Sequence, residues 1–162
     1  MFANALPDRL TDFATPESNW LAPDNVQEDP PARAHRASPT NLGLQLASQI
    51  TAHDFGYVTH QELAMQLHQT LDAVGRLERL RGHFYNWYDT RTLQPLAPFY
   101  ISTVDSGNMA ASLVALKQGC LAMSKRPLID RSTLDALRDH CLIFRDSLPL
   151  EARTGVITIP QF

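Results

Sequence analysis

Four stretches of helical periodicity are joined by connections that alternate between short and long, and this alternation constrains the fold of the chain. The connections at residues 55–58 and 124–131 are short, as is usual between antiparallel neighbouring helices. Those at residues 15–37 and 82–105 are long. In an up-and-down array of helices, this order places both long connections at the same end.

The first two helices carry clear start signals. Ser38 and Pro39 supply an N-cap and a proline at the first helical position, and Gly56 is placed to end that helix. Thr59 and Glu62 form a capping box at the start of the second helix, which we expect Gly82 to end. The apolar positions are Leu42, Leu46 and Ile50 in the first helix and Leu63, Leu67, Leu71, Val74 and Leu77 in the second.

A third helix is expected to follow the pair Asp105–Ser106, with Asp105 as its cap, and to close at residues 125–127. A fourth follows Ser132, with Asp135 in its first turn. The apolar stripes predicted to be buried are Met109, Leu113, Leu116, Cys120 and Met123 in the third helix and Leu134, Leu137, Cys141, Phe144 and Leu148 in the fourth. Residues 6–14 have a weaker helical pattern, and the VITI stretch at 156–159 suggests a short extended segment.

Composition excludes several classes of function. A chain of 162 residues fits one domain, and a net charge of −3 with scattered basic residues gives no footprint for nucleic acid. No apolar run reaches the roughly 20 residues that span a bilayer. Two cysteines, Cys120 and Cys141, are expected to be core thiols without a disulfide, which favours a cytoplasmic protein. The histidines show no metal-ligand spacing, and no cofactor motif is present.

The long connections contain aromatic rings beside short polar side chains. Indole and phenol rings offer flat apolar area, and amides both donate to and accept from vicinal hydroxyls, so a sugar is the expected ligand class. The candidate binding residues are Asn19, Trp20, Asp24, Asn25, Gln27, Glu28, His35 and Arg36 from the first connection and Asn86, Trp87, Tyr88, Asp89, Asp105, Ser106 and Asn108 from the second.

A plainer interpretation remains open for each of these residues. The tryptophans can fill the core, and the Asp, Asn and Ser residues can serve as caps and turn formers. Glycoside chemistry needs a pair of carboxylates roughly 5–9.5 Å apart. Asp24, Glu28, Asp89 and Asp105 are the available carboxylates, and their turn-like or capping surroundings lead us to assign none of them as catalytic.

Several long motifs resemble one known family. They read NWLAPDNVQED (19–29), AHRASPTNLGL (34–44), RGHFYNWYDTRTLQPL (81–96) and STVDSGN (102–108). In this order and spacing they resemble the cyclic β-1,2-glucan synthases, at the start of the glucoamylase-like central domain. Besides the candidate binding residues, the motif residues Ser38 and Asn41 carry over. The resemblance implies a substrate-binding role toward β-1,2-glucan or a related glucose oligomer.

The resemblance also implies a fold and partners. The family's domain is an (α/α)6 toroid that transfers and cyclises glucan, and its catalytic carboxylates belong to later parts of that domain. We therefore expect an all-α chain forming a partial toroid of four to five helices over residues 1–148, followed by a tail at 149–162. Such a chain would be inactive without the rest of the toroid. A stand-alone carbohydrate-binding module and a helical module that packs on a partner chain are the alternatives.

Overall fold

A computed structural model of the chain describes residues 13–129 and 131–148. Within these ranges the chain is mostly helical, with α2 (Pro39–Asp54), α3 (His60–Arg76), α4 (Thr103–Met123) and α5 (Arg131–Ser147). The helix expected at 6–14 lies largely outside the described residues, and the extended segment at 156–159 lies wholly outside them. Among the described helices, none combines the length and apolar content that a bilayer crossing requires.

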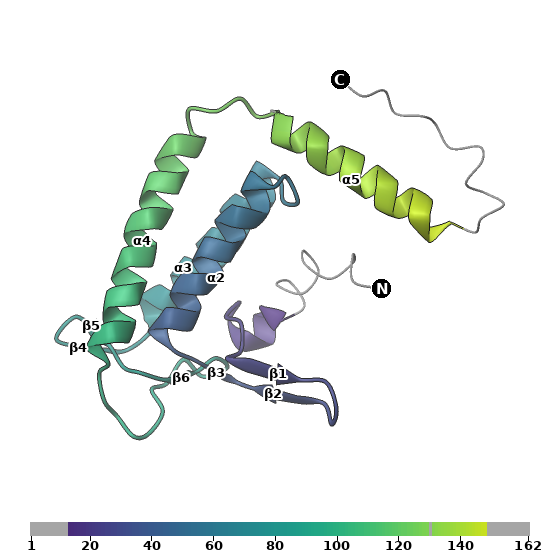
Figure 1. Ribbon diagram of the computed structural model, residues 1–162. Coiled ribbons are helices and arrows are strands. Elements are labelled where there is room, and N and C mark those ends of the chain that lie inside the picture. The colour runs from purple at the N-terminus through teal and green to yellow at the C-terminus, as the bar shows by residue number, and fades with distance from the viewer. Residues whose placement is uncertain (1–12, 130, 149–162) are drawn as a thin grey trace.

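Helix α2 is the central element, because it packs against both α3 and α4 (Figure 1). Its start is the expected one: Ser38 Oγ accepts a hydrogen bond from Asn41 N, and Pro39 occupies the first helical position. Helix α3 also begins as expected, with a reciprocal capping box between Thr59 and Glu62. The core of the described chain comprises Leu21, Ala37, Leu42, Leu46, Leu63, Leu67, Ala73, Val74, Leu77, Phe84, Tyr88, Leu93, Met109 and Leu116.

The close approach of α2 and α4 depends on one glycine. A Cβ atom built on Gly43 would lie 2.5 Å from Ser112 Oγ and 2.9 Å from Ser112 Cβ. Both distances are shorter than real side chains tolerate, so only glycine lets the two helices meet at this contact. Polar residues of both long connections lie beside the N-terminal ends of these two helices.

The expectation of an all-α chain is wrong in the long connections, which contain three antiparallel two-stranded sheets within the described residues. Strands β1 (Asn25–Gln27) and β2 (Ala32–Ala34) form a hairpin that projects from the molecule (Figure 1). A short 3₁₀ helix, Pro16–Ser18, precedes that hairpin. Strand β3 (Arg36–Ala37) pairs with β6 (Tyr88–Asp89), which lies far along the chain. Strands of two or three residues are too short to show an alternating pattern in the sequence.

The third sheet corrects the role predicted for Gly82. Helix α3 ends at Arg76, and β4 (Arg79–Leu80) and β5 (His83–Phe84) follow as a hairpin. Arg81 and Gly82, with φ of 52° and 85°, form the two-residue turn between them. Positive φ at both central residues is the requirement of a type I′ turn, where glycine is favoured. Gly82 therefore closes a hairpin instead of ending the helix.

The start of α4 also differs from the prediction. Ser102 is the N-cap, and its Oγ accepts from Asp105 N at 3.1 Å. Asp105 lies in the first turn of the helix, and Ser106 follows it inside the helix. A serine three residues before an acidic residue resembles the Thr59–Glu62 start of α3, so Ser102 could have been recognised. The shift frees the Asp105 carboxylate for contacts with other elements.

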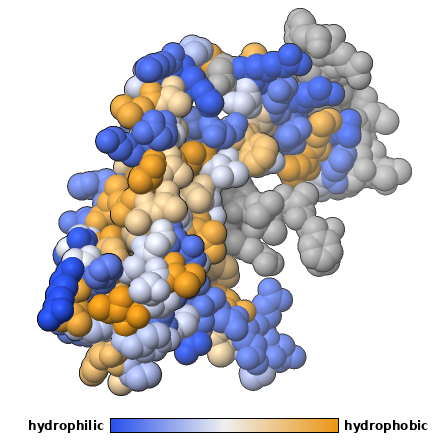
Figure 2. Space-filling view, turned by 60° about the vertical axis from the view of Figure 1, so that its left-hand side comes forward, coloured by the Kyte–Doolittle hydropathy of each residue, from blue (hydrophilic) through white to orange (hydrophobic). Residues whose placement is uncertain are grey.

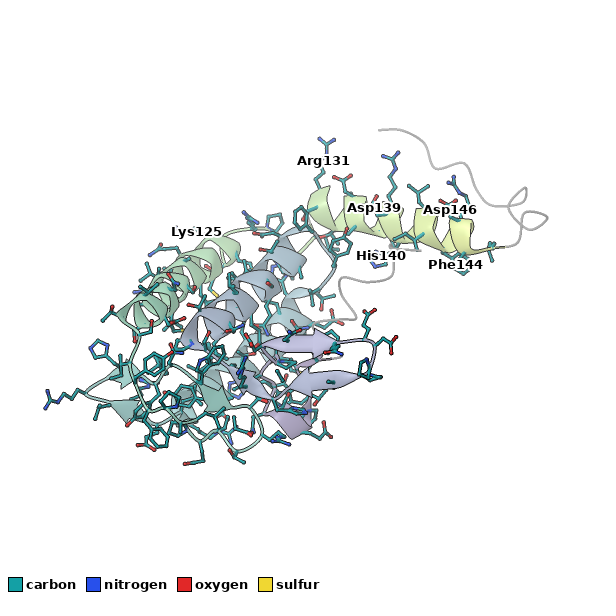
Figure 3. All side chains as sticks on the ribbon, turned by 60° about the horizontal axis from the view of Figure 1, so that its bottom comes forward. Lys125, Arg131, Asp139, His140, Phe144 and Asp146 are labelled. Atoms are coloured by element: carbon teal, nitrogen blue, oxygen red, sulfur yellow. The ribbon has the colours of Figure 1, made fainter. Side chains whose placement is uncertain are left out.

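Helix α5 does not pack along α4, so the predicted burial of its apolar stripe is wrong (Figure 1). Leu134, Leu137 and Phe144 are 59–62% exposed, and only Ala136 of the described part of α5 is buried. Figure 3 shows His140 and Phe144 projecting from one side of the helix and Arg131 from the other. The stripe is present in the sequence, and no described element covers it.

The two cysteines are a second case of predicted burial that the structure does not show. Cys120 on α4 and Cys141 on α5 are free, as expected, but both are exposed, which corrects the prediction that they are core residues. Helix α4 also exposes Val104, Val114 and Leu121, and Figure 2 shows apolar residues at the surface of the face that carries this helix. A stripe at helical spacing predicts a buried face only where another element covers it.

The first turn of α5 packs on the loop between α2 and α3. Substitutions at two glycines, Gly56 inside this contact and Gly82 outside it, test the contact. Gly56 and Gly82 both have positive φ, of 75° and 85°, which costs an alanine roughly 1–2 kcal/mol. A Cβ on Gly56 would also lie 2.7 Å from Ala136 Cβ and Ser132 O, whereas nothing lies within 4 Å of one on Gly82. We expect Gly56→Ala to lower the free energy of unfolding by about 2–4 kcal/mol and Gly82→Ala by about 1–2 kcal/mol in urea denaturation. Equal losses of stability in the two variants would contradict the contact between α5 and the loop that joins α2 to α3.

Candidate functional site

The two long connections meet in one surface, as their alternation in the sequence predicts. Arg36 pairs with Asp89 in the β3–β6 sheet. Asn19 Nδ2 donates to the carbonyl oxygens of Thr90 at 2.9 Å and Arg91 at 2.8 Å. These contacts join segments more than 50 residues apart in the chain. Polar side chains from both connections are thereby gathered beside the N-terminal ends of α2 and α4.

A stacked guanidinium is the first part of the candidate site. The Arg36 Cζ atom lies 4.6 Å from the centroid of the Trp87 ring, and the Arg36 side chain is 51% exposed. Asp24 Oδ2 accepts from Arg36 Nε at 3.2 Å and Nη2 at 3.1 Å, while Asp24 Oδ1 accepts from Asn41 Nδ2 at 3.2 Å. A carboxylate and an indole therefore fix the guanidinium from two directions. Its exposed edge can donate to a ligand.

A chain of hydrogen bonds across α2 and α4 is the second part. Thr40 Oγ1 donates to Asp105 Oδ1 at 2.6 Å and accepts from Asn108 Nδ2 at 3.0 Å. Thr40 lies in the first turn of α2, and Asp105 and Asn108 lie near the start of α4. The contact ties the two helix starts together on the side where the connections meet.

Asn86 links the two parts. Its amide nitrogen donates to Asp105 Oδ2 at 3.0 Å, and its oxygen accepts from Trp87 Nε1 at 2.7 Å and from the Tyr100 hydroxyl at 2.6 Å. In the opposite orientation, the Asn86 amide oxygen would face the Asp105 carboxylate, and its nitrogen would face the Trp87 indole N–H. Neither contact could be a hydrogen bond, so these two partners decide the orientation of the amide. Asn86 is buried, whereas Tyr100 is 48% exposed. We call the connected set the loop-face cluster: Asp24, Arg36, Thr40, Asn41, Asn86, Trp87, Tyr100, Asp105 and Asn108.

Other predicted site residues hold the connections in place. Tyr88 is fully buried; its hydroxyl donates to Glu78 O at 2.6 Å and accepts from Tyr85 N at 2.7 Å. Burial raises the pKa of Tyr88 to about 12. Asp89 Oδ1 accepts from the backbone N–H of Arg91 at 2.8 Å. The hydrogen bond from the Arg91 side chain lowers the pKa of Asp89 below its usual value.

Four predicted residues lie away from the loop-face cluster. Asn25 and Gln27 are exposed on β1, and Glu28 follows them in the turn of the β1–β2 hairpin. Trp20 lines a pocket on the α2–α3 flank. The remaining two, His35 and Ser106, each bury a side-chain atom, Nδ1 and Oγ, that has no partner among the described residues. The structure thus brings together Asp24, Arg36, Asn86, Trp87, Asp105 and Asn108.

Thr40 and Tyr100 belong to the cluster, although the sequence did not single them out. Thr40 follows the Ser38–Pro39 cap and has the appearance of an ordinary first-turn residue. Tyr100 lies near the end of the second long connection. Its position two residues before the Ser102 cap is the sequence signal that could have identified it as a cluster residue. Asn41, which the motifs had included, combines a capping contact with the one to Asp24.

The carboxylates of the site are engaged in structural contacts. Asp24 is paired with Arg36, Asp89 with Arg91, and Asp105 accepts from Thr40. Donors within the described chain therefore occupy all three carboxylates. Among the described residues, no group of three or more His, Cys, Asp or Glu side chains is placed to hold a metal ion. The arrangement is suited to binding.

Comparison with known proteins identifies the relationship. No family model matches the chain. The cyclic beta-(1,2)-glucan synthase NdvB of Rhizobium meliloti (strain 1021) is 41% identical over 138 residues, which is 84% of this chain. The chain spans 5% of the length of that relative. An identity this high over most of the chain, in agreement with the motifs of both long connections, is specific. The chain belongs to the cyclic β-1,2-glucan synthase family.

Proposed function

We propose that the chain contributes part of the glucan-binding end of a cyclic β-1,2-glucan synthase, within its glycosyl-transferring and cyclising domain. The observation that carries the proposal is the Arg36–Trp87 stack, fixed by Asp24 on one side and by Asn86 on the other. An apolar ring beside fixed polar groups suits a glucose unit, which has apolar faces and hydroxyls at its edge.

The cluster is prepared for a ligand because its side chains are held before binding. Trp87 is fixed through its N–H by Asn86, and Asp105 is fixed through Thr40 and Asn86. A site ordered in advance loses less conformational entropy when ligand binds. Tyr100 stands at the exposed edge and can donate to or accept from a hydroxyl. We assign these residues to binding and none to catalysis.

We further propose that this chain forms one segment of an (α/α) toroid whose other helices cover α4 and α5. The exposed Leu134, Leu137 and Phe144 of α5 support this arrangement, because apolar residues at helical spacing favour burial against another element. The same observation supports the second candidate function, a helical module that packs on a partner chain. In either case the segment's own role is binding, without catalysis.

Calorimetry with linear β-1,2-glucan tests the proposed binding. We expect millimolar or tighter affinity for the full chain, and Trp87→Ala is expected to weaken it at least about tenfold because the stacking surface is lost. Arg36→Lys keeps the charge but loses the fork-shaped donor and the flat stack, so it should weaken binding less than Trp87→Ala.

Phe55→Ala is the matched control, because Phe55 is an exposed aromatic residue at the opposite end of α2. Binding by this variant should equal that of the unmodified chain. An absence of heat at millimolar glucan, or an equal loss in Phe55→Ala and Trp87→Ala, would contradict a binding role for the loop-face cluster.

A further inference from the structure

A pocket lies outside the loop-face cluster, on the flank formed by α2 and α3. The pocket has a volume of about 190 Å³ and is lined by Ala14, Trp20, Gln49, Met65, Gln66, Gln69 and Thr70. It shares no residue with the loop-face cluster. None of its lining side chains is charged, so it offers nothing to compensate a charged ligand.

The backbone of Trp20 is held in a conformation that is unusual for a bulky residue. Its φ is 60°, in the left-handed region, and Asn19 before it has a φ of 52°. Gln45 stabilises this turn: its Nε2 donates to Trp20 O at 2.8 Å, and its Oε1 accepts from Ala22 N at 2.9 Å. Left-handed backbone at a tryptophan is retained only where the surroundings impose it. Here it places the indole at the pocket wall.

Gln49 supplies an unsatisfied acceptor at the same pocket. Its side chain is buried, and its Nε2 donates to Thr70 Oγ1 at 3.0 Å. Thr70 Oγ1 also accepts from Gln45 Nε2 at 3.2 Å. The Gln49 Oε1 atom has no hydrogen-bond partner among the described residues. A buried acceptor without a donor is unfavourable, so a ligand that brings an O–H group to Gln49 would stabilise the site.

We propose that this pocket binds a small neutral hydroxylated ring, the size of one monosaccharide or cyclic polyol. The size of the ligand follows from the volume of the pocket, which is below the roughly 300–1,000 Å³ of sites for drug-sized ligands. Trp20 and Met65 provide apolar contact for one face of the ring. Gln49 accepts from a hydroxyl, and Gln66 and Gln69, which also line the pocket, can donate or accept. The proposal does not depend on glucan binding by the loop-face cluster.

Nuclear magnetic resonance of the full chain tests the proposal, because Trp20 and Trp87 are the two tryptophans and give separate indole N–H signals. D-glucose and myo-inositol are titrated as probes. We expect one of them to shift the Trp20 signal with a dissociation constant of about 1–10 mM, in the range of small weak ligands. The Trp20 response should persist in Trp87→Ala, which separates this pocket from the loop-face cluster. An unchanged Trp20 signal with both probes would overturn the proposal.

Two variants measured by calorimetry identify the contacts. Gln49→Leu removes the acceptor and should weaken binding about tenfold. Trp20→Gly removes the ring while glycine accepts the positive φ without strain, so the fold is retained and binding should be lost. Gln27→Leu, at an exposed glutamine on β1, is the control and should bind normally. Undiminished binding in Trp20→Gly would overturn the assignment, even if Gln49→Leu fails to fold.

Discussion

Replacing Tyr88 by alanine is expected to lower the free energy of unfolding by about 4 kcal/mol, because a fully buried ring is removed from the core. Tyr88 lies in β6, and its hydroxyl joins Glu78 O and Tyr85 N across the β4–β5 hairpin. The loss would loosen the strand that pairs with Arg36 as well as the hairpin. Urea denaturation followed by circular dichroism measures the change.

Tyr88→Phe separates the hydroxyl from the ring. It keeps the ring and leaves the Glu78 carbonyl and the Tyr85 amide without their partner, so we expect a loss of about 1–3 kcal/mol. A smaller loss in Tyr88→Ala than in Tyr88→Phe would contradict the assignment of the ring to the core. Tyr57→Ala, at a more exposed tyrosine near the opposite end of α2, should cost less than either.

The raised pKa of Tyr88 adds a dependence on alkaline pH. The folded protein holds the phenol proton up to a pKa of about 12, whereas the unfolded chain releases it near 10. The unfolded state therefore binds fewer protons between these values, and stability falls as pH rises through this window. The contribution is complete below pH 10. Tyr88→Phe lacks the group, so its stability should fall less than that of the unmodified chain between about pH 10 and 12.

Local signals in the sequence predicted the starts of α2 and α3 correctly. The Thr59–Glu62 capping box and the Ser38–Pro39 start are satisfied within three residues of chain, so local chemistry suffices. The pairing of Arg36 with Asp89 is a different matter, because it depends on where two distant connections come together. Two-residue strands carry no periodic signal that could have predicted this contact.

The sequence predicted which two connections form the candidate site. It did not predict which of their residues come together there. Asp24 and Asp89 both occupy turn-like sequence surroundings, yet Asp24 pairs with the stacked Arg36 and Asp89 with the neighbouring Arg91. Trp20 and Trp87 likewise have similar polar neighbours, and the left-handed turn at Trp20 directs it to the pocket on the α2–α3 flank. Such differences arise from tertiary contacts, which a sequence pattern does not contain.

Helix α5 shows a complementary failure. Its amphipathic pattern correctly predicted a helix, and the same pattern predicted burial that the described chain does not provide. The pattern specifies a helix that buries one face, without specifying which element covers it.

Gly43→Leu is expected to lower the free energy of unfolding by about 3 kcal/mol, because α2 and α4 cannot separate without loss of core packing. Even the first side-chain atom would meet Ser112 Oγ at 2.5 Å and Ser112 Cβ at 2.9 Å. Gly75→Leu on α3 is the matched control, since a Cβ there meets nothing within 4 Å. That change should raise stability by about 0.5–1 kcal/mol through helix propensity alone. Urea denaturation of both variants gives the comparison.

The substitution at Gly43 also links packing to binding. Thr40 on α2 and Asp105 and Asn108 on α4 form hydrogen bonds across the same pair of helices. If Gly43→Leu moves the helices apart, these bonds lengthen and Asp105 no longer fixes Asn86, so we expect glucan affinity to fall together with stability. Combining Gly43→Ala with Ser112→Gly removes the opposing side chain and should recover both properties. Full glucan affinity in a folded Gly43→Leu protein would show that binding does not require the contact between α2 and α4.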